Sequence, residues 1–355
     1  MILREFFRSG ARRIVDKGII GRQASEKMET KSNAGTLTDF ISLKDLSVSR
    51  WRQLMRVSEE VKRHPANFRQ MLPGKSIVML FEKASLRTRL TFELGVKQLG
   101  GEAVYLDYQD SKLGGRESLA DVARNMERWF DCIVARTFSH QTVVTLAEHG
   151  SIPVINALTD EEHPCQALAD TFTLMEKWGD VSGKTLAFVG DGNNVCASLI
   201  HAAALSGMSF VAITPTTHKP YEGAADDYRR LAVSDTSRYR WTDSLEGLKG
   251  VDAVYTDTWV SMGQEDEARE RIRVFESYQV TPEVMAMTGR NAYFMHCLPA
   301  HRNHEVTDAV IDSQASLVFE QAENRLHVQK ALMLLLMAPR ELERYLQLDK
   351  WAGWS

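Results

Sequence analysis

Residues 76–89 read SIVMLFEKASLRTR and contain the strand-to-helix junction from which the fold can be worked out. Residues 76–81 form a short apolar run, which predicts a buried strand. A helix is expected to begin near Leu86 or Arg87. Similar apolar runs follow at helix-length intervals, at 102–107, 132–138 and 153–158. Strands that alternate with helices in this way predict βαβ units and a parallel sheet.

A second series of the same kind follows the polar, turn-rich stretch 176–184. Strands are expected at 185–190, 209–215, 253–259 and 292–298. A last strand is expected at about 316–320, followed by a helix that carries Leu326, Ala331, Leu332 and Leu335. We therefore predict an α/β protein of two doubly wound parallel-sheet domains, with a C-terminal helix that crosses back to the first domain.

Composition narrows the class of ligand. The 355 residues are 44% hydrophobic, enough for about two domains. A net charge of -4 gives no general attraction to nucleic acid or to an anionic membrane, so any anion site is local and favours a small ligand. No apolar run reaches the roughly 20 residues of a membrane span. The four cysteines include no CxxC pair, which argues against disulfides or a zinc site and favours reduced thiols in the cytoplasm.

Residues 1–36 differ from the rest because basic and apolar residues alternate there before a polar stretch. A targeting helix is one interpretation, but Glu5 and Asp16 weaken it because transit peptides are poor in acidic residues. We favour a mobile extension, or a start codon upstream of the alternative start Met28.

The strand-to-helix junction at 81–89 has the character of an anion site. Lys83, Arg87 and Arg89 surround Ser85 and Thr88 where the helix should begin. Unpaired N–H groups at a helix N-terminus, hydroxyl donors and an arginine fork suit a phosphate. An ordinary serine N-cap with surface arginines explains the isolated pattern equally well.

Two further motifs carry polar groups of chemical interest. In HPCQ, at 163–166, His163 can stabilise a developing oxyanion and Gln166 can bind an amide, although His-Pro also marks ordinary helix boundaries. In HCLPA, at 296–300, Cys297 lies at the carboxyl end of an expected strand, although buried thiols are usually inert.

The last two motifs concern the second domain. GDGNN, at 190–194, has the first two glycines of a dinucleotide fingerprint but Val195 in place of the third, so a nicotinamide cofactor is disfavoured. The asparagines instead suit the carboxylate of a zwitterion. In DTWVSMG, at 257–263, Asp257 suggests a positively charged group such as an amine, unless it is a turn or N-cap aspartate.

Taken in order across residues 85–325, the motifs SLRTR, HPCQ, GDGNN, DTWVSMG, HCLP and AENR resemble the transcarbamylase family, and within it the ornithine carbamoyltransferases. The resemblance implies a carbamoyl phosphate domain at 37–178, completed by the C-terminal helix 322–355, and an ornithine domain at 179–321. It also implies a homotrimer with active sites shared between subunits, and a reaction that needs neither a metal nor an organic cofactor.

The resemblance also implies roles for particular residues. Carbamoyl phosphate would be bound by Ser85, Leu86 (through its backbone), Arg87, Thr88, Lys112, Arg136, His163, Gln166, Cys297, Leu298 and Arg325. Ornithine would be bound by Asn193, Asn194, Asp257, Ser261 and Met262. The residues expected to act in catalysis are Arg87, Arg136, His163, Asp257 and Cys297.

The sequence departs from the family pattern at two positions. Leu86 replaces the usual threonine of STRTR, which is tolerable because this position is expected to contribute its backbone N–H. Lys112 stands where ornithine enzymes often have glutamine or histidine, in a loop expected to reach a neighbouring subunit's site. It either pairs with the phosphate there, as in aspartate enzymes, or is a solvated loop lysine.

Ornithine is the acceptor that fits these motifs best, giving citrulline in arginine metabolism. Aspartate would need cations in place of Asp257, and N-acetylornithine or N-succinylornithine would not need its charge. Putrescine has no carboxylate for Asn194 to bind. A non-catalytic binding protein on the same fold and a nicotinamide-dependent oxidoreductase are the alternatives from other classes.

Overall fold

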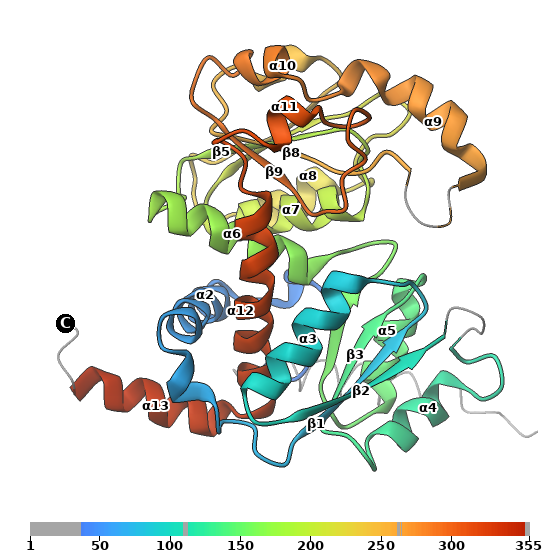
Figure 1. Cartoon of the computed structure of the whole chain (residues 1–355), viewed down its shortest axis with the longest axis vertical. Coiled ribbons are helices and arrows are strands. Elements are labelled where there is room, and N and C mark those ends of the chain that lie inside the picture. Colours follow the sequence, from blue (N-terminus) through green and yellow to red (C-terminus); the bar gives the residue numbers. More distant parts are fainter. Residues whose placement is uncertain (1–36, 109–112, 261–262, 264, 352–355) are drawn as a thin grey trace, which may run out of the picture. The chain divides into compact units, whose positions relative to one another are not determined.

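Two parallel sheets organise this computed structural model, which describes residues 37–108, 113–260, 263 and 265–351 (Figure 1). The described residues from Asp39 onward belong to one compact unit. The extension expected at 1–36 lies outside the described residues. Among those that are described, no helix combines the length and apolar character needed to cross a membrane.

The first sheet has four strands in the order β2-β1-β3-β4, all parallel. Its strands are β1 (Ser76–Phe81), β2 (Glu102–Asp107), β3 (Cys132–Arg136) and β4 (Val154–Leu158). Its helices are α2 (Val48–Arg63), α3 (Leu86–Gln98), α4 (Leu119–Met126), α5 (His140–His149) and α6 (Pro164–Trp178). Val78 and Leu80 of β1 face α4 and α5 in one buried cluster. The strands expected in this part of the chain are confirmed.

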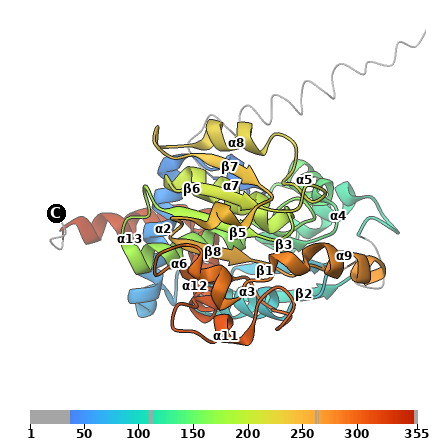
Figure 2. The same ribbon diagram turned by 90° about the horizontal axis from the view of Figure 1, so that it is seen from above.

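The second sheet has five strands in the order β7-β6-β5-β8-β9, again all parallel (Figure 2). Its strands are β5 (Thr185–Val189), β6 (Ser209–Ile213), β7 (Tyr239–Thr242), β8 (Ala253–Thr256) and β9 (Tyr293–His296). Its helices are α7 (Asn194–Ser206), α8 (Ala224–Leu231), α9 (Ala268–Phe275), α10 (Pro282–Ala286) and α11 (Asp308–Ile311). Short 3₁₀ helices lie at Leu43–Asp45, Pro65–Phe68, Leu245–Leu248, Glu265–Glu267 and Glu276–Tyr278. Val254 and Phe294 lie in the buried cluster on one face of this sheet, while α7 packs on β6.

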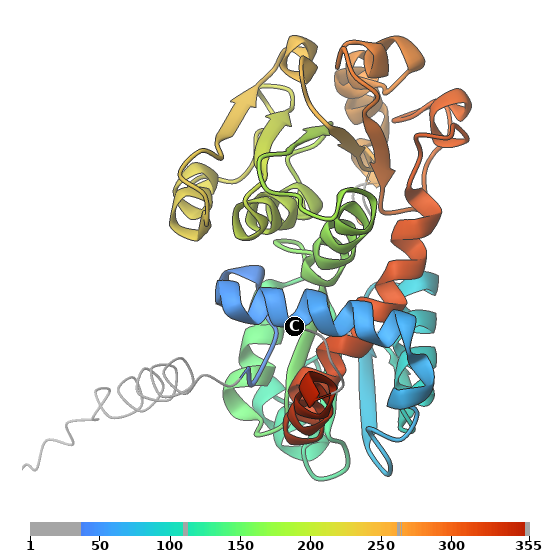
Figure 3. The ribbon, with the colours of Figure 1, turned by 90° about the vertical axis from the view of Figure 1, so that its left-hand side faces the viewer.

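Helix α12 (Val318–Met337) connects the two sheets, and α13 (Pro339–Trp351) follows it. Figure 3 shows α12 in orange-red passing beside α2 in blue, and it also packs on α3 and α6. The predicted helix that crosses back to the first domain is therefore confirmed. Residues 331–336 of α12 are buried, so the helix completes the first sheet's core.

The strand expected at 316–320 is wrong. Ser316 makes only an isolated bridge to Phe294, and the chain is already helical from Val318. A short apolar run cannot by itself distinguish a buried strand from a helix start. Here Val318 is buried while Phe319 is 69% exposed, and the helix that follows sets the local structure.

Candidate active site

A cavity of about 770 Å³ lies where strands from both sheets end. Its walls come mainly from the segments after β1, β3, β4, β5, β6, β8 and β9, with Arg271 from α9 and Arg325 from α12. The predicted site residues that line it are Ser85, Leu86, Arg87, Arg136, His163, Asn193, Asn194, Asp257, Cys297, Leu298 and Arg325. Thr88 and Gln166 do not line it and are buried, 0% and 1% exposed. The predicted contacts Lys112, Ser261 and Met262 lie outside the described residues.

The N-terminus of α3 forms one wall of the cavity. Ser85 is the N-cap of α3, since its hydroxyl accepts a hydrogen bond from the Thr88 N–H at 3.2 Å. The capping interpretation is therefore confirmed, yet Ser85 and the half-buried Arg87 also line the cavity. Arg325 adds a second guanidinium, whose Nη2 donates to Thr88 Oγ1 at 2.7 Å. Free helix N–H groups and guanidiniums together suit an anion with several oxygens.

The other two cations of the SLRTR junction have different positions. Lys83 is buried, pairs with Asp160, and lies 4.5 Å from the ring centre of Phe138; all three line the cavity. Lys83 was not predicted to be among the binding residues. Arg89 points to the surface, where it pairs with Glu93 at 3.4 Å. The expectation that Arg89 surrounds the anion is therefore wrong, because its position on the helix turns it away.

Burial and crowding of positive charge lower the pKa values of three basic groups in the cavity. Burial, together with the neighbouring Arg325 guanidinium, lowers the pKa of Arg136 to about 9. Burial also lowers the pKa of Arg325. The pKa of His163 falls well below its usual value, because it is buried beside both arginines. At neutral pH the site therefore holds charged arginines next to a neutral imidazole, which donates through one nitrogen only.

A carboxylate stands in the same cavity. Asp257 is 7% exposed; its Oδ2 accepts from Asn193 Nδ2 at 2.8 Å, and its Oδ1 accepts from the Cys297 thiol at 3.0 Å. Burial and the Asp257 charge raise the pKa of Cys297 well above its usual value. Cys297 therefore keeps its proton and serves as a hydrogen-bond donor. Asn193 is also the N-cap of α7, so its main contacts are internal.

The second glycine of GDGNN is explained by backbone packing. A Cβ on Gly192 would meet the Lys219–Pro220 peptide at 2.4 Å, which no side chain tolerates. Asp191 pairs with Arg271, whose Nε donates to the Trp259 carbonyl at 2.6 Å. Asp191 and Arg271 line the cavity, and neither was predicted from the sequence because they lie 80 residues apart.

One trio in the cavity region has the atoms of a metal site. Asp257, His296 and Cys297 each offer a ligand atom, and these atoms lie within 4.8 Å of one another. Both ring nitrogens of His296 already have partners: Nδ1 accepts from the Leu298 N–H at 2.9 Å, and Nε2 lies 3.1 Å from Glu305 Oε1. These hydrogen bonds account for the trio without an ion.

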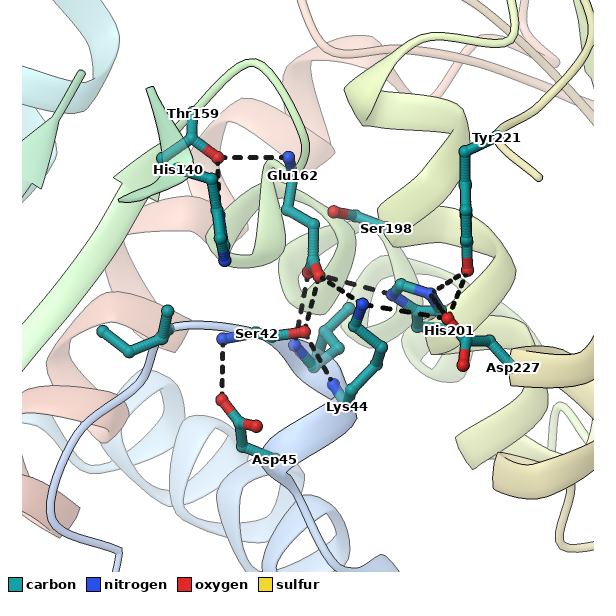
Figure 4. A network of polar contacts seen from close by, with 12 residues as sticks. Ser42, Lys44, Asp45, His140, Thr159, Glu162, Ser198, His201, Tyr221 and Asp227 are labelled. Carbon is teal, nitrogen blue, oxygen red and sulfur yellow. Dashed lines mark hydrogen bonds and ion pairs between the residues drawn. The ribbon is translucent and has the colours of Figure 1, made fainter. Parts of the chain in front are cut away.

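A network of polar contacts holds the loop that precedes His163 (Figure 4). Glu162 accepts from Ser42 Oγ at 2.5 Å, and it lies 3.8 Å from both Lys44 Nζ and His201 Nδ1. The His201 ring reaches Tyr221, whose hydroxyl donates to Asp227 at 2.8 Å.

Backbone groups tie the same loop to α7. The N–H of His163 donates to Ser198 Oγ at 2.8 Å, and Asn194 Nδ2 donates to the Thr159 carbonyl at 2.6 Å. The imidazole of His163 is thus placed by contacts on both sides of its loop, from α7 and from the segment 42–44.

Two family models match consecutive parts of the chain. Residues 38–176 match the model described as "Aspartate/ornithine carbamoyltransferase, carbamoyl-P binding domain", and residues 182–336 match its "Asp/Orn binding domain". The chain is 47% identical over 299 residues to the ornithine carbamoyltransferase of Shewanella oneidensis, covering 84% of this chain and 99% of that protein. It is 48% identical over 309 residues to that of Symbiobacterium thermophilum, covering 84% and 98%.

Solved structures agree with the sequence matches. The ornithine carbamoyltransferase from Pyrococcus furiosus aligns with a TM-score of 0.81 at 41% identity, over 85% of this chain and 97% of that chain. The enzyme from Thermus thermophilus aligns with a TM-score of 0.77 at 39% identity, over 85% and 100%.

Proposed function

This chain belongs to the aspartate/ornithine carbamoyltransferase family, and from that premise we infer that it transfers the carbamoyl group of carbamoyl phosphate to the δ-amine of L-ornithine. The products are citrulline and phosphate. One observation carries the inference: a single cavity is lined by Arg87, Arg136 and Arg325, by the N-terminus of α3 and by the carboxylate of Asp257. An anionic donor and an amino-acid acceptor both find groups of opposite charge there.

The phosphate would bind at the N-terminus of α3. Arg87 and Arg325 would supply charge, and Ser85 and the Leu86 N–H would supply further donors. Thr88, which does not line the cavity, would support them through its contacts with Ser85 and Arg325. The hydroxyls of Ser85 and Thr88 are already bonded to each other. The main contacts with the anion would therefore come from the N-terminus of α3 and from the arginines. Lys112 is proposed to reach a phosphate in a neighbouring subunit.

Carbonyl polarisation would fall to Arg136 and His163. The free amine of ornithine adds to the carbonyl carbon, and the oxygen becomes negatively charged in the tetrahedral intermediate. A guanidinium and a neutral imidazole N–H aimed at this oxygen stabilise it; loss of one such donor typically costs about 3 kcal/mol. Phosphate then leaves with its charge balanced by Arg87 and Arg325, and it takes up the proton that the attacking nitrogen loses.

The amino acid would bind beside Asp257. The carboxylate of Asp257 would attract the α-ammonium group of ornithine. Asn194, Ser261 and Met262 would contact the rest of the substrate. Because Cys297 keeps its proton, we assign it a donor role near the carbamoyl group and the δ-amine, together with Leu298, and exclude a thiolate nucleophile. The attacking amine has to arrive unprotonated, so the rate is expected to rise with pH as ornithine loses its δ-proton.

Assembly and location complete the proposal. Leu86, Leu90 and Leu94 recur every fourth residue on α3 and are 70%, 52% and 47% exposed, which favours burial against another subunit in a homotrimer with shared active sites. The two sheets support the division into domains 37–178 with 322–355, and 179–321. The four cysteines are free, which favours a cytoplasmic location.

The proposal is tested by assaying carbamoyl transfer with the purified protein. Carbamoyl phosphate would be supplied with ornithine and, in parallel, with N-acetylornithine, N-succinylornithine, putrescine and aspartate. Ornithine is expected to give the highest kcat/KM by a wide margin. A better rate with another acceptor would contradict the role of Asp257, and no reaction with any acceptor would favour a non-catalytic binding protein.

A further inference from the structure

A chain of buried hydrogen bonds links α6, α12 and the end of β9. Helices α6 and α12 are neighbours (Figure 1). Gln166 and Asp170 lie one turn apart on α6, Gln321 lies in the first turn of α12, and His296 ends β9. None of the four side chains is more than 1% exposed. Gln166 Nε2 and Gln321 Nε2 both donate to Asp170 Oδ1 at 2.8 Å, and Gln321 Oε1 accepts from the His296 backbone N–H at 3.0 Å.

The direction of this chain follows from chemistry. A backbone N–H can only donate, so Gln321 has to turn its oxygen toward His296 and its NH2 group toward Asp170. An ionised carboxylate can only accept, so Gln166 also has to turn its NH2 group toward Asp170. Burial raises the pKa of Asp170 to about 6, against the opposing effect of hydrogen bonds from Gln321 and Gln166, so the side chain is largely ionised at pH 7.5 to 8.

Two oxygens of the chain have no hydrogen-bond partner among the described residues. One is Asp170 Oδ2, which lies near the Tyr255 hydroxyl, and the other is at the Gln166 end of the chain. Gln166 Oε1 is buried and has no hydrogen-bond partner among the residues that the structure describes. A buried acceptor without a partner is costly unless a ligand satisfies it. Gln166 lies one turn into α6 from His163, which lines the cavity.

We propose that Asp170 and Gln321 are positioning residues that hold the amide of Gln166 with its oxygen, and not its NH2 group, toward the substrate. This inference rests on the proposed function and on the role that the family resemblance implies for Gln166, which is to bind the NH2 group of carbamoyl phosphate. The pair would make the site selective for a carbamoyl group over an acyl group such as acetyl, because a methyl group cannot donate to Gln166 Oε1.

Exchanging the carboxylate and the amide tests the proposal directly. In the double variant Asp170→Asn/Gln321→Glu the net charge is unchanged, and the new carboxylate at position 321 still accepts from His296. It can no longer donate, so the amide at position 170 has to donate to it. Gln166 then has to turn its oxygen inward and its NH2 group toward the substrate. All of these hydrogen bonds can form in the double variant. The two bonds made by the side chain at position 170 are reversed in direction, whereas the bond from the His296 N–H is not.

The double variant is expected to keep its Tm within a few degrees of the wild-type value and to lose kcat/KM for carbamoyl phosphate by about tenfold or more, the effect of a donor facing a donor. Binding of inorganic phosphate, measured by calorimetry, is expected to be unchanged because the phosphate residues are untouched. The KM for ornithine at saturating carbamoyl phosphate is expected to stay the same.

Two single variants serve as controls. Asp170→Asn keeps an oxygen between the two NH2 groups, so it is expected to retain activity within about threefold of the wild-type value. Asn324→Asp changes another buried amide between α12 and α6 that is not part of this hydrogen-bond chain. The Nδ2 atom of Asn324 donates to Thr173 Oγ1 at 2.9 Å. It is expected to lower the Tm without a selective loss for carbamoyl phosphate.

A folded double variant as active as Asp170→Asn would overturn the proposal, because hydrogen bonding of either direction would then suffice. If the double variant does not fold, Asp170→Ala replaces it, with the affinities for carbamoyl phosphate and acetyl phosphate measured by calorimetry. The proposal expects the difference between these affinities to narrow in Asp170→Ala and to persist in Asp170→Asn; equal losses for both ligands would overturn it. A wild-type protein that transfers no carbamoyl group would contradict the proposed function instead.

Discussion

Two arginines on the first turn of α3 provide a matched pair for testing the phosphate site. Arg87 lines the cavity, whereas Arg89 pairs with Glu93 on the surface and stacks over Tyr105 at 4.1 Å. Both belong to the same helix, carry the same charge and lie two residues apart. Arg87→Ala and Arg89→Ala therefore differ in the direction of the side chain that each removes.

The size of the expected effect follows from the contacts that a guanidinium can make. A charge-assisted hydrogen bond contributes about 1.5 to 3 kcal/mol, and an arginine fork can make two to a phosphate. Since Arg87 is only half-buried, we take the lower figure for each bond, about 3 kcal/mol in total or roughly a hundredfold in Kd. Arg89→Ala is expected to change the Kd by less than about threefold, because exposed pairs contribute little.

Calorimetric titration with carbamoyl phosphate, and separately with inorganic phosphate, measures both effects. The weakening in Arg87→Ala should also diminish at high salt, since part of it is the loss of a partly screened charge. Unchanged affinity in Arg87→Ala, or an equal loss in Arg89→Ala, would refute the assignment of the helix N-terminus as the phosphate site.

Three more predictions follow from the cavity and its supports. Asp257→Asn keeps the shape of the side chain but loses its charge, so kcat/KM for ornithine should fall by about a hundredfold while calorimetry shows intact carbamoyl phosphate binding; an unaltered rate would remove the role assigned to Asp257. Because burial and Asp257 raise the pKa of Cys297, iodoacetamide should modify this thiol much more slowly at pH 8 than a small free thiol, and rapid labelling would contradict a protonated donor. Burial alone would raise the pKa of Glu162, but His201 and Ser42 lower it below its ordinary value of 4.5. The ionised carboxylate therefore stabilises the folded state above pH 4.5, and this stabilisation is lost as the pH falls through the depressed pKa. Glu162→Gln should therefore lower the Tm at pH 7, and the difference from the wild-type Tm should shrink below about pH 4; a constant difference would show that the charge is not involved.

The sequence was sufficient to predict the strands whose apolar runs are bounded by clear turn signals. Strands β1 to β6, β8 and β9 were expected within a few residues of their bounds. Apart from the edge strand β2, their interior positions are buried on both faces, which gives continuous apolar runs. β7 was missed, since Tyr239–Thr242 reads as a mixed polar run at an edge of the sheet. The start of α12 was misassigned for a related reason: a short apolar run has no period of its own.

Site residues that belong to a continuous sequence motif could be predicted. Residues that the fold brings together from distant parts of the chain could not. His163 and Asp257 stand in recognisable motifs, and the structure places both in the cavity. Asp170 and Gln321 lie 151 residues apart, and nothing local marks either as part of one hydrogen-bond chain. Lys83 was visible as a cation, but its pairing with Asp160 depends on the fold.

The path of α12 has a consequence for how the protein is made. The first sheet is complete in sequence by Leu158, yet part of the core beside it is supplied by residues 331–336, near the other end of the chain. During synthesis, the apolar faces of α2, α3 and α6 that α12 covers stay without this packing partner until the whole second sheet has been translated. The nascent first half is therefore expected to remain loosely packed and to be the stage at which the chain most needs protection from aggregation, until α12 supplies both the missing core and Arg325.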